Sequence, residues 1–374
     1  MSDKVRIGVV GTSWWADSMY LPAITNHPLA DVRAVAGGTR PDHTREFAAR
    51  WNVPAAYDSL EAMLDGENLD AVLILTSNRS HHDLALTAIG RGLHVLCEKP
   101  LGLSAAEARE MAEAAERAGV TTMVPFTYRF MPTGRYVKEL VDEGFIGRPY
   151  HLAMRYWTGY GRSGAYAWRF DHGEAGALGV TGDIGSHWAY LARWFFGEVV
   201  AVTAVLTRMM PRDPRPDGAP FEAADDSGTI VFEFASGATG TLLVTSLAYE
   251  PGPFGQRHEW DLVGSGGTLH VLNDWVRTQQ VLGVRDGEPE LRELPIPDRI
   301  WQGARRDVVH DTYRDVFRRE DHMTRAFVTA ISEGRPASPD FADGLAIQRI
   351  LEATAISGRE GRRVRIAEVV DAGG

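Results

Sequence analysis

Hydrophobic and polar positions follow two different patterns along the chain, and the first pattern runs from residue 4 to about residue 125. There, short and almost wholly apolar segments alternate with stretches in which apolar residues recur at helical spacing. The predicted strands are 5–10, 32–36, 70–75, 93–97 and 121–124, and the predicted helices are 16–27, 42–51, 59–65, 79–91 and 104–118. Because apolar strands separated by helices are typical of a parallel sheet covered on both faces, residues 1–125 are predicted to form a doubly wound α/β domain.

The second pattern begins near residue 126 and favours longer strands with few helices between them. The predicted strands are 150–158, 199–209, 228–235, 238–248, 258–263 and 268–271, the predicted helices are 133–143, 184–196, 312–333 and 341–357, and 211–225 and 283–310 are predicted to be irregular. Turn-forming residues at 235–238 and 264–267 join neighbouring strands into hairpins. Residues 126–374 are therefore predicted to form an α+β domain with an antiparallel sheet.

Composition and charge narrow the class of protein. The chain has 374 residues, of which 44% are hydrophobic, so it carries enough apolar surface for two domain cores. A net charge of −11 disfavours binding to nucleic acid, because no basic surplus displaces counterions. With one cysteine, Cys97, no apolar run of about 18 residues and no signal-cleavage pattern, we expect a cytoplasmic protein without a membrane span. The 12 histidines include no zinc-binding spacing, so no metal site is predicted.

The first predicted strand runs into the sequence Gly11-Thr12-Ser13-Trp14-Trp15-Ala16. A strand, a tight turn and a helix in this order can hold a dinucleotide pyrophosphate, because glycine permits close backbone approach and the helix N-terminus supplies amide donors. We therefore assign Gly11, Ser13, Trp14 and Trp15 to a cofactor site. Ser13 stands where a second glycine is usual, and a plain strand–turn–helix is the alternative.

The end of the second predicted strand bears on which nicotinamide cofactor fits. An acidic residue there binds the ribose 2′-hydroxyl of NAD and repels a 2′-phosphate. The chain has Gly37-Gly38-Thr39-Arg40 at this point, with a hydroxyl at Thr39 and a guanidinium at Arg40. The sequence thus predicts a preference for NADP. In the alternative, Arg40 is solvated in a turn and NAD also binds.

Two further polar groups follow predicted strands. These groups are Thr76-Ser77-Asn78 with His81, and Glu98-Lys99-Pro100. Because ligands of open α/β sheets lie beyond the carboxyl ends of the strands, both groups are predicted to line the same cleft. A lysine there can orient a substrate hydroxyl and stabilise alkoxide charge. The alternative for Lys99 and Glu98 is a surface ion pair that contributes little.

Asp183 and His187 stand four residues apart at the start of the apolar helix predicted over 184–196. Residues at this spacing lie on one side of a helix, one turn apart. An acid in that position can orient the imidazole or raise its pKa, which suits a general base near neutral pH. The alternative is an aspartate that caps the helix beside an ordinary, partly buried histidine.

Taken together, these motifs resemble the Gfo/Idh/MocA oxidoreductases over essentially the whole chain. The shared features are the opening turn, Thr76-Ser77-Asn78 with His81, Glu98-Lys99-Pro100, Tyr128-Arg129-Phe130, Asp183-x-Gly185-x-His187, Phe327-x-x-Ala330-Ile331 and Asp343-Gly344. The resemblance implies an N-terminal Rossmann domain and a C-terminal α/β domain with an open, mainly antiparallel sheet. It also implies NAD(P)-dependent oxidation or reduction at a carbon of a sugar, cyclitol or related polyol.

The resemblance also implies roles for individual residues, with Lys99, Asp183 and His187 as the catalytic set. Trp168-Arg169 is similar to a Trp-Arg pair that contacts the cofactor in sugar reductases of this family. The residues expected at the cofactor are Gly11, Ser13, Trp14, Trp15, Thr39, Arg40, Thr76, Ser77, Asn78, His81, Glu98, Lys99, Arg129, Trp168 and Arg169. Those expected at the substrate are Lys99, Arg129, Tyr156, Asp171, Asp183 and His187. The aromatic members of this set alternatively pack the sheet, and Asp225-Asp226 either accepts substrate hydroxyls or caps a strand.

Three functions remain compatible with the sequence. The favoured one is hydride transfer between nicotinamide C4 and a carbinol carbon, in which His187 exchanges the hydroxyl proton, Lys99 holds the oxygen and Asp183 positions the substrate or the histidine. The alternatives are a glycoside-cleaving enzyme that uses tightly held NAD for transient oxidation, and a regulator that senses the cofactor without catalysis. We expect a small-molecule partner. The alternating strand Thr229–Phe234 must bury one side, and the resemblance implies a homodimer or homotetramer through this C-terminal sheet.

Overall fold

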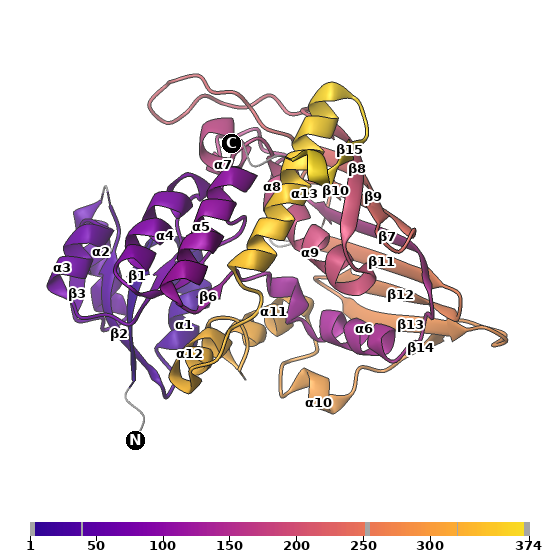
Figure 1. Ribbon diagram of the computed structural model, residues 1–374, viewed down its shortest axis with the longest axis horizontal. Helices are drawn as coiled ribbons and strands as arrows, with labels where there is room; N and C mark the ends of the chain where they lie inside the picture. The colour runs from indigo at the N-terminus through magenta and orange to yellow at the C-terminus, as the bar shows by residue number, and fades with distance from the viewer. Residues whose placement is uncertain (1–3, 39, 251–254, 320, 370–374) are drawn as a thin grey trace. The chain divides into compact units, whose positions relative to one another are not determined.

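The computed structural model describes residues 4–38, 40–250, 255–319 and 321–369, and the chain divides into two compact units. The first unit contains residues 1–125 and 314–346, and the second contains 126–313 and 347–374. The sequence analysis left 314–346 in the second domain. These residues instead pack with the first unit, because α12 (Thr324–Glu333) lies against strands of its sheet. Figure 1 shows the course of the chain by colour.

The first unit is built on a six-stranded sheet in which every neighbouring pair is parallel. Its strands are β1 (Val5–Val10), β2 (Ala30–Ala36), β3 (Ala55–Tyr57), β4 (Ala71–Ile74), β5 (His94–Cys97) and β6 (Thr122–Met123). The order β3-β2-β1-β4-β5-β6 reverses direction between β1 and β4, which is where open α/β sheets bind ligands. The predicted doubly wound parallel sheet is confirmed.

Short helices connect these strands. They are η1 (Ala16–Tyr20), α1 (Leu21–Ile24), α2 (Pro41–Arg50), α3 (Leu60–Gly66), η2 (Asn78–Ser80), α4 (His81–Gly90) and α5 (Ala105–Ala118). The best-marked helix in the sequence is α5, where the Ser104 hydroxyl accepts the Glu107 amide at 3.2 Å. It ends at Gly119, which has φ +66° and so takes the left-handed conformation typical of a helix end.

The second unit contains a nine-stranded sheet in the order β14-β13-β12-β11-β7-β10-β9-β8-β15. The strands are β7 (Pro149–Thr158), β8 (Val199–Thr207), β9 (Ser227–Phe234), β10 (Thr239–Thr245), β11 (Gln256–Gly264), β12 (Gly267–Asp274), β13 (Thr278–Arg285), β14 (Arg292–Glu293) and β15 (Val364–Arg365). Strands β7 and β10 run parallel, and the other neighbouring pairs are antiparallel. This confirms the expected open, mainly antiparallel sheet.

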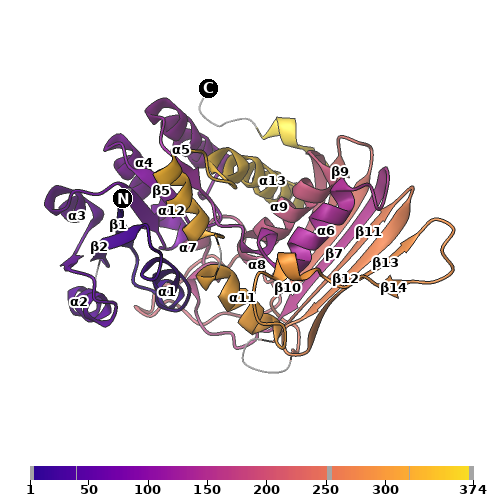
Figure 2. The same ribbon diagram turned by 90° about the horizontal axis from the view of Figure 1, so that it is seen from below.

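Helices cover one face of this sheet. The helices of the unit are η3 (Thr127–Arg129), α6 (Pro132–Asp142), η4 (Trp168–Phe170), α7 (His172–Ala175), α8 (Val180–Asp183), α9 (Gly185–Phe196), α10 (Asp298–Trp301) and η5 (Ile366–Glu368), while α11 (Val309–Arg318) and α13 (Phe341–Glu360) each run from one unit into the other. Figure 2 shows α6 and α9 on the same side of the sheet. In the part of the chain that the structure describes, no helix lies on the opposite side.

The structure differs from the sequence predictions at β13 and at the helix predicted over 312–333. Strand β13 lies mostly in a segment with no prediction, because its sequence TQQVLGVR offers little alternation of apolar and polar residues. The single helix predicted over 312–333 is two helices, α11 and α12. Just before α12, Met323 has φ +52°, a conformation that interrupts a right-handed helix and that the sequence does not mark with a glycine.

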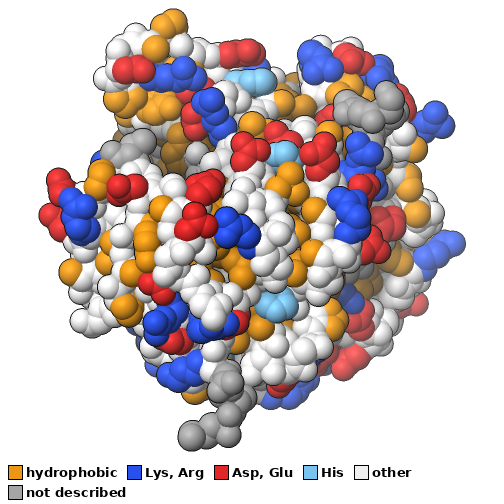
Figure 3. All heavy atoms as spheres, turned by 60° about the vertical axis from the view of Figure 1, so that its left-hand side comes forward, with side chains coloured by type: hydrophobic (Ala, Val, Ile, Leu, Met, Phe, Trp, Pro, Cys, Tyr) orange, Lys and Arg blue, Asp and Glu red, His pale blue; other side chains and the backbone are white. Residues whose placement is uncertain are grey.

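Two surface properties follow from the described residues. No helix among them is both long enough and apolar enough to cross a membrane. On the face that Figure 3 presents, acidic and basic side chains are interspersed, in keeping with the acidic net charge of the chain.

Candidate functional site

The turn that follows β1 requires glycine at its first position. Gly11 has φ +105°, and a Cβ atom there would lie 2.5 Å from the carbonyl oxygen of Leu75. At the next glycine position of the usual pattern, the Ser13 hydroxyl accepts the backbone amide of Ala16 at 3.4 Å. Gly11 therefore still allows a dinucleotide pyrophosphate to come close to the backbone, and Ser13 caps the helix that follows.

The two tryptophans after this turn lie in different surroundings. Trp14 is 55% exposed. Trp15 packs edge-on against Phe317, with ring centroids 5.7 Å apart, and its indole Nε1 donates a hydrogen bond of 2.7 Å to the Glu98 carboxylate. Trp15 thus connects the β1 turn to the end of β5.

Parallel pairing brings three of the predicted groups to one edge of the first sheet. The carboxyl ends of β1, β4 and β5 are neighbours, and they lead into Gly11, Thr76 and Glu98. Thr76 accepts a hydrogen bond of 2.7 Å from the Ser80 hydroxyl at its Oγ1, and Asn78 opens η2 with a buried side chain. The strand order is compatible with the expectation that these residues line one cleft, which stays a prediction.

Lys99 lies between two fixed neighbours. The Glu98 carboxylate accepts the Tyr20 hydroxyl at 2.5 Å and the Lys99 backbone amide at 3.1 Å. On the other side, the carbonyl oxygen of Pro100 lies 3.0 Å from His81 Nδ1. His81 is fully buried, and burial lowers its pKa, so it is a neutral donor to Pro100. His81 therefore supports the Lys99 backbone, and it offers no surface to the cofactor we expected it to touch.

The segment after β2 contains a glycine with free space around it, Gly38, and a positively charged residue, Arg40. Gly38 has φ +65°, and no atom lies within 4 Å of the position its Cβ would take. Thr39 lies outside the described residues. Arg40 is exposed just before α2, and its guanidinium makes no ion pair with any residue that the structure describes. Because β2 also ends without an acid, the residues present fit a dinucleotide with a 2′-phosphate.

In the second unit, Asp183 and His187 do not share a helix. Asp183 is the last residue of α8, His187 lies in the first turn of α9, and Ile184 separates the two helices. The expected i,i+4 pairing on one helix is therefore not the arrangement present. Asp183 Oδ2 instead accepts the Tyr160 hydroxyl and pairs with Arg169 Nε, each at 3.1 Å.

Asp225 holds the helix that carries Asp183. It is 2% exposed, and its carboxylate accepts the Gly179 amide at 2.7 Å, the Thr181 amide at 3.0 Å and the Thr181 hydroxyl at 2.6 Å. Burial raises the pKa of Asp225, although these hydrogen bonds oppose the shift. The sequence left two roles for this carboxylate, which were to accept substrate hydroxyls or to cap a strand. Its contacts favour a structural role, but the element that it holds is α8 rather than a strand.

Aromatic rings surround His187, which is 5% exposed. The Tyr128 ring lies 4.9 Å from the imidazole at 81°, and Tyr156 packs 4.3 Å from His258 in the same cluster. Trp275 Nε1 donates to His258 Nε2 at 3.0 Å, and burial lowers the pKa of His258 well below its usual value, so this second histidine is neutral. Tyr156 is 1% exposed and donates its hydroxyl to Gln256, so it packs the sheet rather than facing a substrate.

The remaining predicted residues separate into accessible and enclosed ones. Arg129 donates to the Tyr190 hydroxyl from α9 and lies over the Trp194 ring. Arg169 lies over Trp168, with its guanidinium carbon 4.5 Å from the ring centroid. Asp171, in contrast, is fully buried, and Arg215 binds both of its oxygens at 2.7 and 2.9 Å. The Asp171 carboxylate therefore already bonds within the protein and is not placed to bind substrate.

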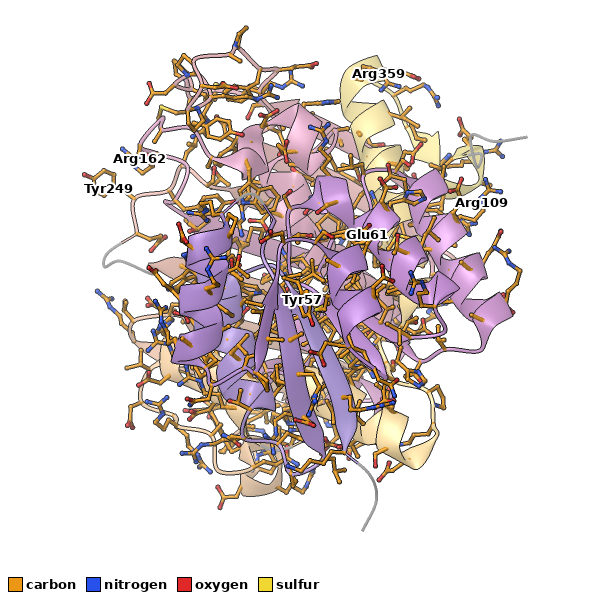
Figure 4. The ribbon with its side chains drawn as sticks, turned by 90° about the vertical axis from the view of Figure 1, so that its left-hand side faces the viewer. Tyr57, Glu61, Arg109, Arg162, Tyr249 and Arg359 are labelled. Atoms are coloured by element: carbon orange, nitrogen blue, oxygen red, sulfur yellow. The ribbon has the colours of Figure 1, made fainter. Side chains whose placement is uncertain are left out.

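Two loops of the second unit meet close to Tyr160. The Arg162 guanidinium lies over the Tyr249 ring, 4.3 Å from its centroid, and both side chains point away from the body of the unit (Figure 4). Arg162 also donates to the Leu247 carbonyl at 2.9 Å, which ties the loop after β7 to the loop after β10. The described residues contain no group of three or more His, Cys, Asp or Glu side chains placed to hold a metal ion.

Sequence reasoning did not predict the contacts that orient the candidate residues, although it named Asp225 as a substrate ligand or a strand cap. Tyr20, Tyr160 and Asp225 hold Glu98, Asp183 and α8 respectively. Tyr160 carries a weak signal in the sequence, because it is a polar aromatic residue two positions beyond the end of β7. Tyr20 carries none, since it reads as an ordinary apolar helix position.

Comparisons with known proteins identify the family of the chain and its fold. Residues 5–126 match the GFO_IDH_MocA family model, described as an oxidoreductase family with an NAD-binding Rossmann fold, and residues 135–270 match the GFO/IDH/MocA C-terminal domain. Levoglucosan dehydrogenase of Pseudarthrobacter phenanthrenivorans is 27% identical, with 87% of each chain covered. D-xylose 1-dehydrogenase (NADP(+)) 2 of Haloferax volcanii is 29% identical over 97% of this chain and 100% of that protein. A solved levoglucosan dehydrogenase in complex with NADH and levoglucosan has the same fold, with a TM-score of 0.84 at 24% identity over 97% of this chain and 99% of that one.

Proposed function

As the chain belongs to the Gfo/Idh/MocA family of oxidoreductases, we propose that it transfers hydride between NADP, in preference to NAD, and a carbinol or carbonyl carbon of a sugar, cyclitol or related polyol. The substrate class is supported by similar proteins that are named dehydrogenases of levoglucosan, D-xylose and myo-inositol. The observation that carries the proposal is the fixed Lys99 at the carboxyl edge of a parallel sheet, beside a turn that only glycine can form.

The chemistry divides between the cofactor and three side chains. When bound, the cofactor would supply the hydride chemistry, with its nicotinamide C4 as the acceptor in oxidation and the donor in reduction. Lys99 Nζ holds the substrate oxygen and stabilises its negative charge as the alkoxide develops. His187 takes the hydroxyl proton in oxidation and returns it in reduction. Asp183, fixed by Tyr160 and Arg169, positions the substrate or His187.

The NADP preference rests on the end of β2. Arg40 supplies a planar fork that matches phosphate geometry, and no acid is present there to repel a 2′-phosphate. The backbone approach at Gly11 serves the pyrophosphate of either cofactor. The choice between NAD and NADP is thus assigned to Arg40 and its neighbours rather than to the first turn.

The test uses Lys99→Met and His187→Gln, with Lys138→Met and His151→Gln as matched controls at partly exposed positions outside the proposed catalytic set. We expect kcat on a panel of sugars and cyclitols to fall by about 10²–10⁴ in the first pair, because a group that holds or moves the proton is lost. The Kd for NADP, measured by fluorescence titration, should stay within about threefold. Wild-type turnover in either variant would overturn the proposal, whereas NAD(H) that copurifies without net redox turnover would instead favour the glycoside-cleaving alternative.

We further propose that the protein acts in the cytoplasm as a homodimer or homotetramer joined through the C-terminal sheet. The uncovered face of that sheet supports the assembly, because Val205, Val231 and Leu243 are 65%, 38% and 41% exposed on it. The single cysteine, Cys97, is buried, and so the chain does not depend on an oxidising compartment.

A further inference from the structure

Trp14 and Trp15 stand at an unusual place for two large side chains, directly after the β1 turn. Trp14 is mostly exposed, but Trp15 is half-buried and its indole N–H is directed at Glu98, 83 positions along the chain. A glycine-rich turn does not require a tryptophan here, and a smaller apolar residue would leave Glu98 without this donor. The role of the Trp15 side chain is therefore to be sought at the end of β5, where its hydrogen-bond partner Glu98 lies.

The Glu98 carboxylate is 7% exposed and accepts three donors from the first unit. Trp15 Nε1 and the Tyr20 hydroxyl reach Oε1 at 2.7 and 2.5 Å, and the backbone amide of Lys99 reaches Oε2 at 3.1 Å. Because all three contacts donate to its oxygens, the Glu98 side chain is held in a single orientation.

This carboxylate folds back onto the peptide that leads into Lys99. The peptide is fixed at its start by the Glu98 amide, which donates to the Ile74 carbonyl at 3.0 Å, and beyond Lys99 by His81 at the Pro100 carbonyl. The direction in which the Lys99 side chain leaves the backbone therefore depends on where the Glu98 carboxylate sits. Trp15 sets that position from the helix that follows the cofactor turn.

We propose that Trp15 is a positioning residue that connects the pyrophosphate-binding turn to Lys99 through Glu98. The inference rests on the proposed function of Lys99. In this arrangement a shift of the β1 turn moves the indole, the carboxylate and the Lys99 peptide together. The lysine is thereby placed for catalysis relative to the same backbone that holds the cofactor.

The test removes the indole N–H group of Trp15 and keeps an aromatic ring at that position. Trp15→Phe keeps an aromatic ring against Phe317 but removes the donor to Glu98. Trp51→Phe is the matched control, because Trp51 Nε1 also donates to a carboxylate, that of Asp17, at 2.8 Å in the same unit. We expect Trp15→Phe to lower kcat about tenfold or more, while KM for the sugar stays within about threefold and the Kd for NADP, to whose predicted site Trp15 belongs, changes less than kcat because an aromatic ring is kept. Trp51→Phe should leave all three values at the wild-type level.

A double-mutant cycle separates positioning from a general loss of packing. In a Glu98→Met background the acceptor is gone, so adding Trp15→Phe should cause no further loss of kcat. If the two substitutions lower kcat independently, Trp15 does not act through Glu98. Should Trp15→Phe fold poorly in a thermal melt, Tyr20→Phe removes the other donor to the same oxygen and is expected to lower kcat in the same way.

Hydrogen exchange gives a readout that needs no substrate. The Lys99 amide donates to Glu98 Oε2, so its exchange, followed by mass spectrometry, should speed up in Trp15→Phe and remain slow in Trp51→Phe. Unchanged exchange together with wild-type kcat in Trp15→Phe would overturn the positioning role. That result is distinct from failure of the proposed function, in which Lys99→Met itself would remain active.

Discussion

Arg40 is the residue to which we assign the proposed preference for NADP. Its guanidinium is exposed beside the open backbone of Gly38 and is not used in an ion pair with any described side chain. We predict that Arg40→Ala weakens NADP binding about 10- to 100-fold, since a charge-assisted hydrogen bond contributes roughly 1.5–3 kcal/mol. NAD has no 2′-phosphate, so its Kd should change less than about twofold. Isothermal titration calorimetry with both cofactors measures the difference.

A neighbouring arginine provides the control for this prediction. Arg45 lies on α2, the helix that directly follows Arg40, and its side chain is 63% exposed and pairs with Asp42. Arg45→Ala removes the same charge without touching the proposed phosphate site, so it should leave the preference for NADP intact. Equal losses for the two cofactors in Arg40→Ala would mean that the arginine does not read the 2′-phosphate.

At the scale of elements, Asp171 joins η4, α7 and the loop that carries Arg215. Its carboxylate accepts the Gly173 amide at 3.0 Å and binds Arg215 through both oxygens. The Arg215 guanidinium lowers the pKa of Asp171. A carboxyl whose pKa is lower in the folded state stabilises the fold above its unfolded pKa and loses that contribution as pH falls through the folded pKa.

We therefore predict that Asp171→Asn lowers the free energy of unfolding by about 1–3 kcal/mol at pH 7. The gap between variant and wild type should shrink as pH falls below the usual aspartate pKa of about 3.9, because the wild-type carboxyl then also loses its charge. Urea titrations at several pH values measure this. Asp217→Asn, at an exposed position of the same loop, should show no comparable gap, and a gap in Asp171→Asn that stays constant with pH would contradict the role of its charge.

The elements that the sequence predicted are those whose signals are local. The cap at Ser104 and the glycine at Gly119 both lie within or next to α5, so adjacent residues suffice to mark it. Strand β3 is three residues long, with the sequence AAY, and it forms because β2 pairs with it rather than because of its own pattern. The separation of α11 from α12 depends on backbone torsion at Met323, which side-chain pattern does not report.

The candidate site likewise has residues that local sequence motifs reveal and residues that they do not. Lys99, Asp183 and His187 stand in recognisable motifs, so the sequence analysis could name them. Their orienting partners come from distant segments, as Tyr20 does for Glu98 and Tyr160 for Asp183. Asp171 and Tyr156 looked suited to a sugar because of their residue types, but only folding decides that one is enclosed by Arg215 and the other by the sheet.

At the scale of the whole molecule, the uncovered face of the second sheet is the surface that we propose for assembly. Exposed apolar side chains on adjacent strands β8, β9 and β10 form one surface there, because Val231 pairs with Thr203 and Thr241 in the sheet. We predict that Val231→Lys reduces self-association and gives monomers in light scattering, since it places a charge in the proposed apolar interface.

Leu291→Lys is the matched control for the interface. Leu291 is 48% exposed just before β14, away from β8 and β9 in the strand order, so a lysine there should leave the oligomer unchanged. A wild-type protein that scatters as a monomer, or a Val231→Lys variant that remains assembled, would show that this face is not the interface.

The division of the chain also has a consequence for biosynthesis. The first unit needs residues 314–346, whose helix α12 lies against its sheet, yet residues 126–313 must be made before them. At roughly 5–20 residues per second, a ribosome spends about 10 to 40 s on that stretch. Throughout this time the nascent first unit waits with the α12 side of its sheet uncovered. Chaperones that bind apolar surface are therefore expected to engage the emerging chain in this interval, and to release it once α12 has left the exit tunnel.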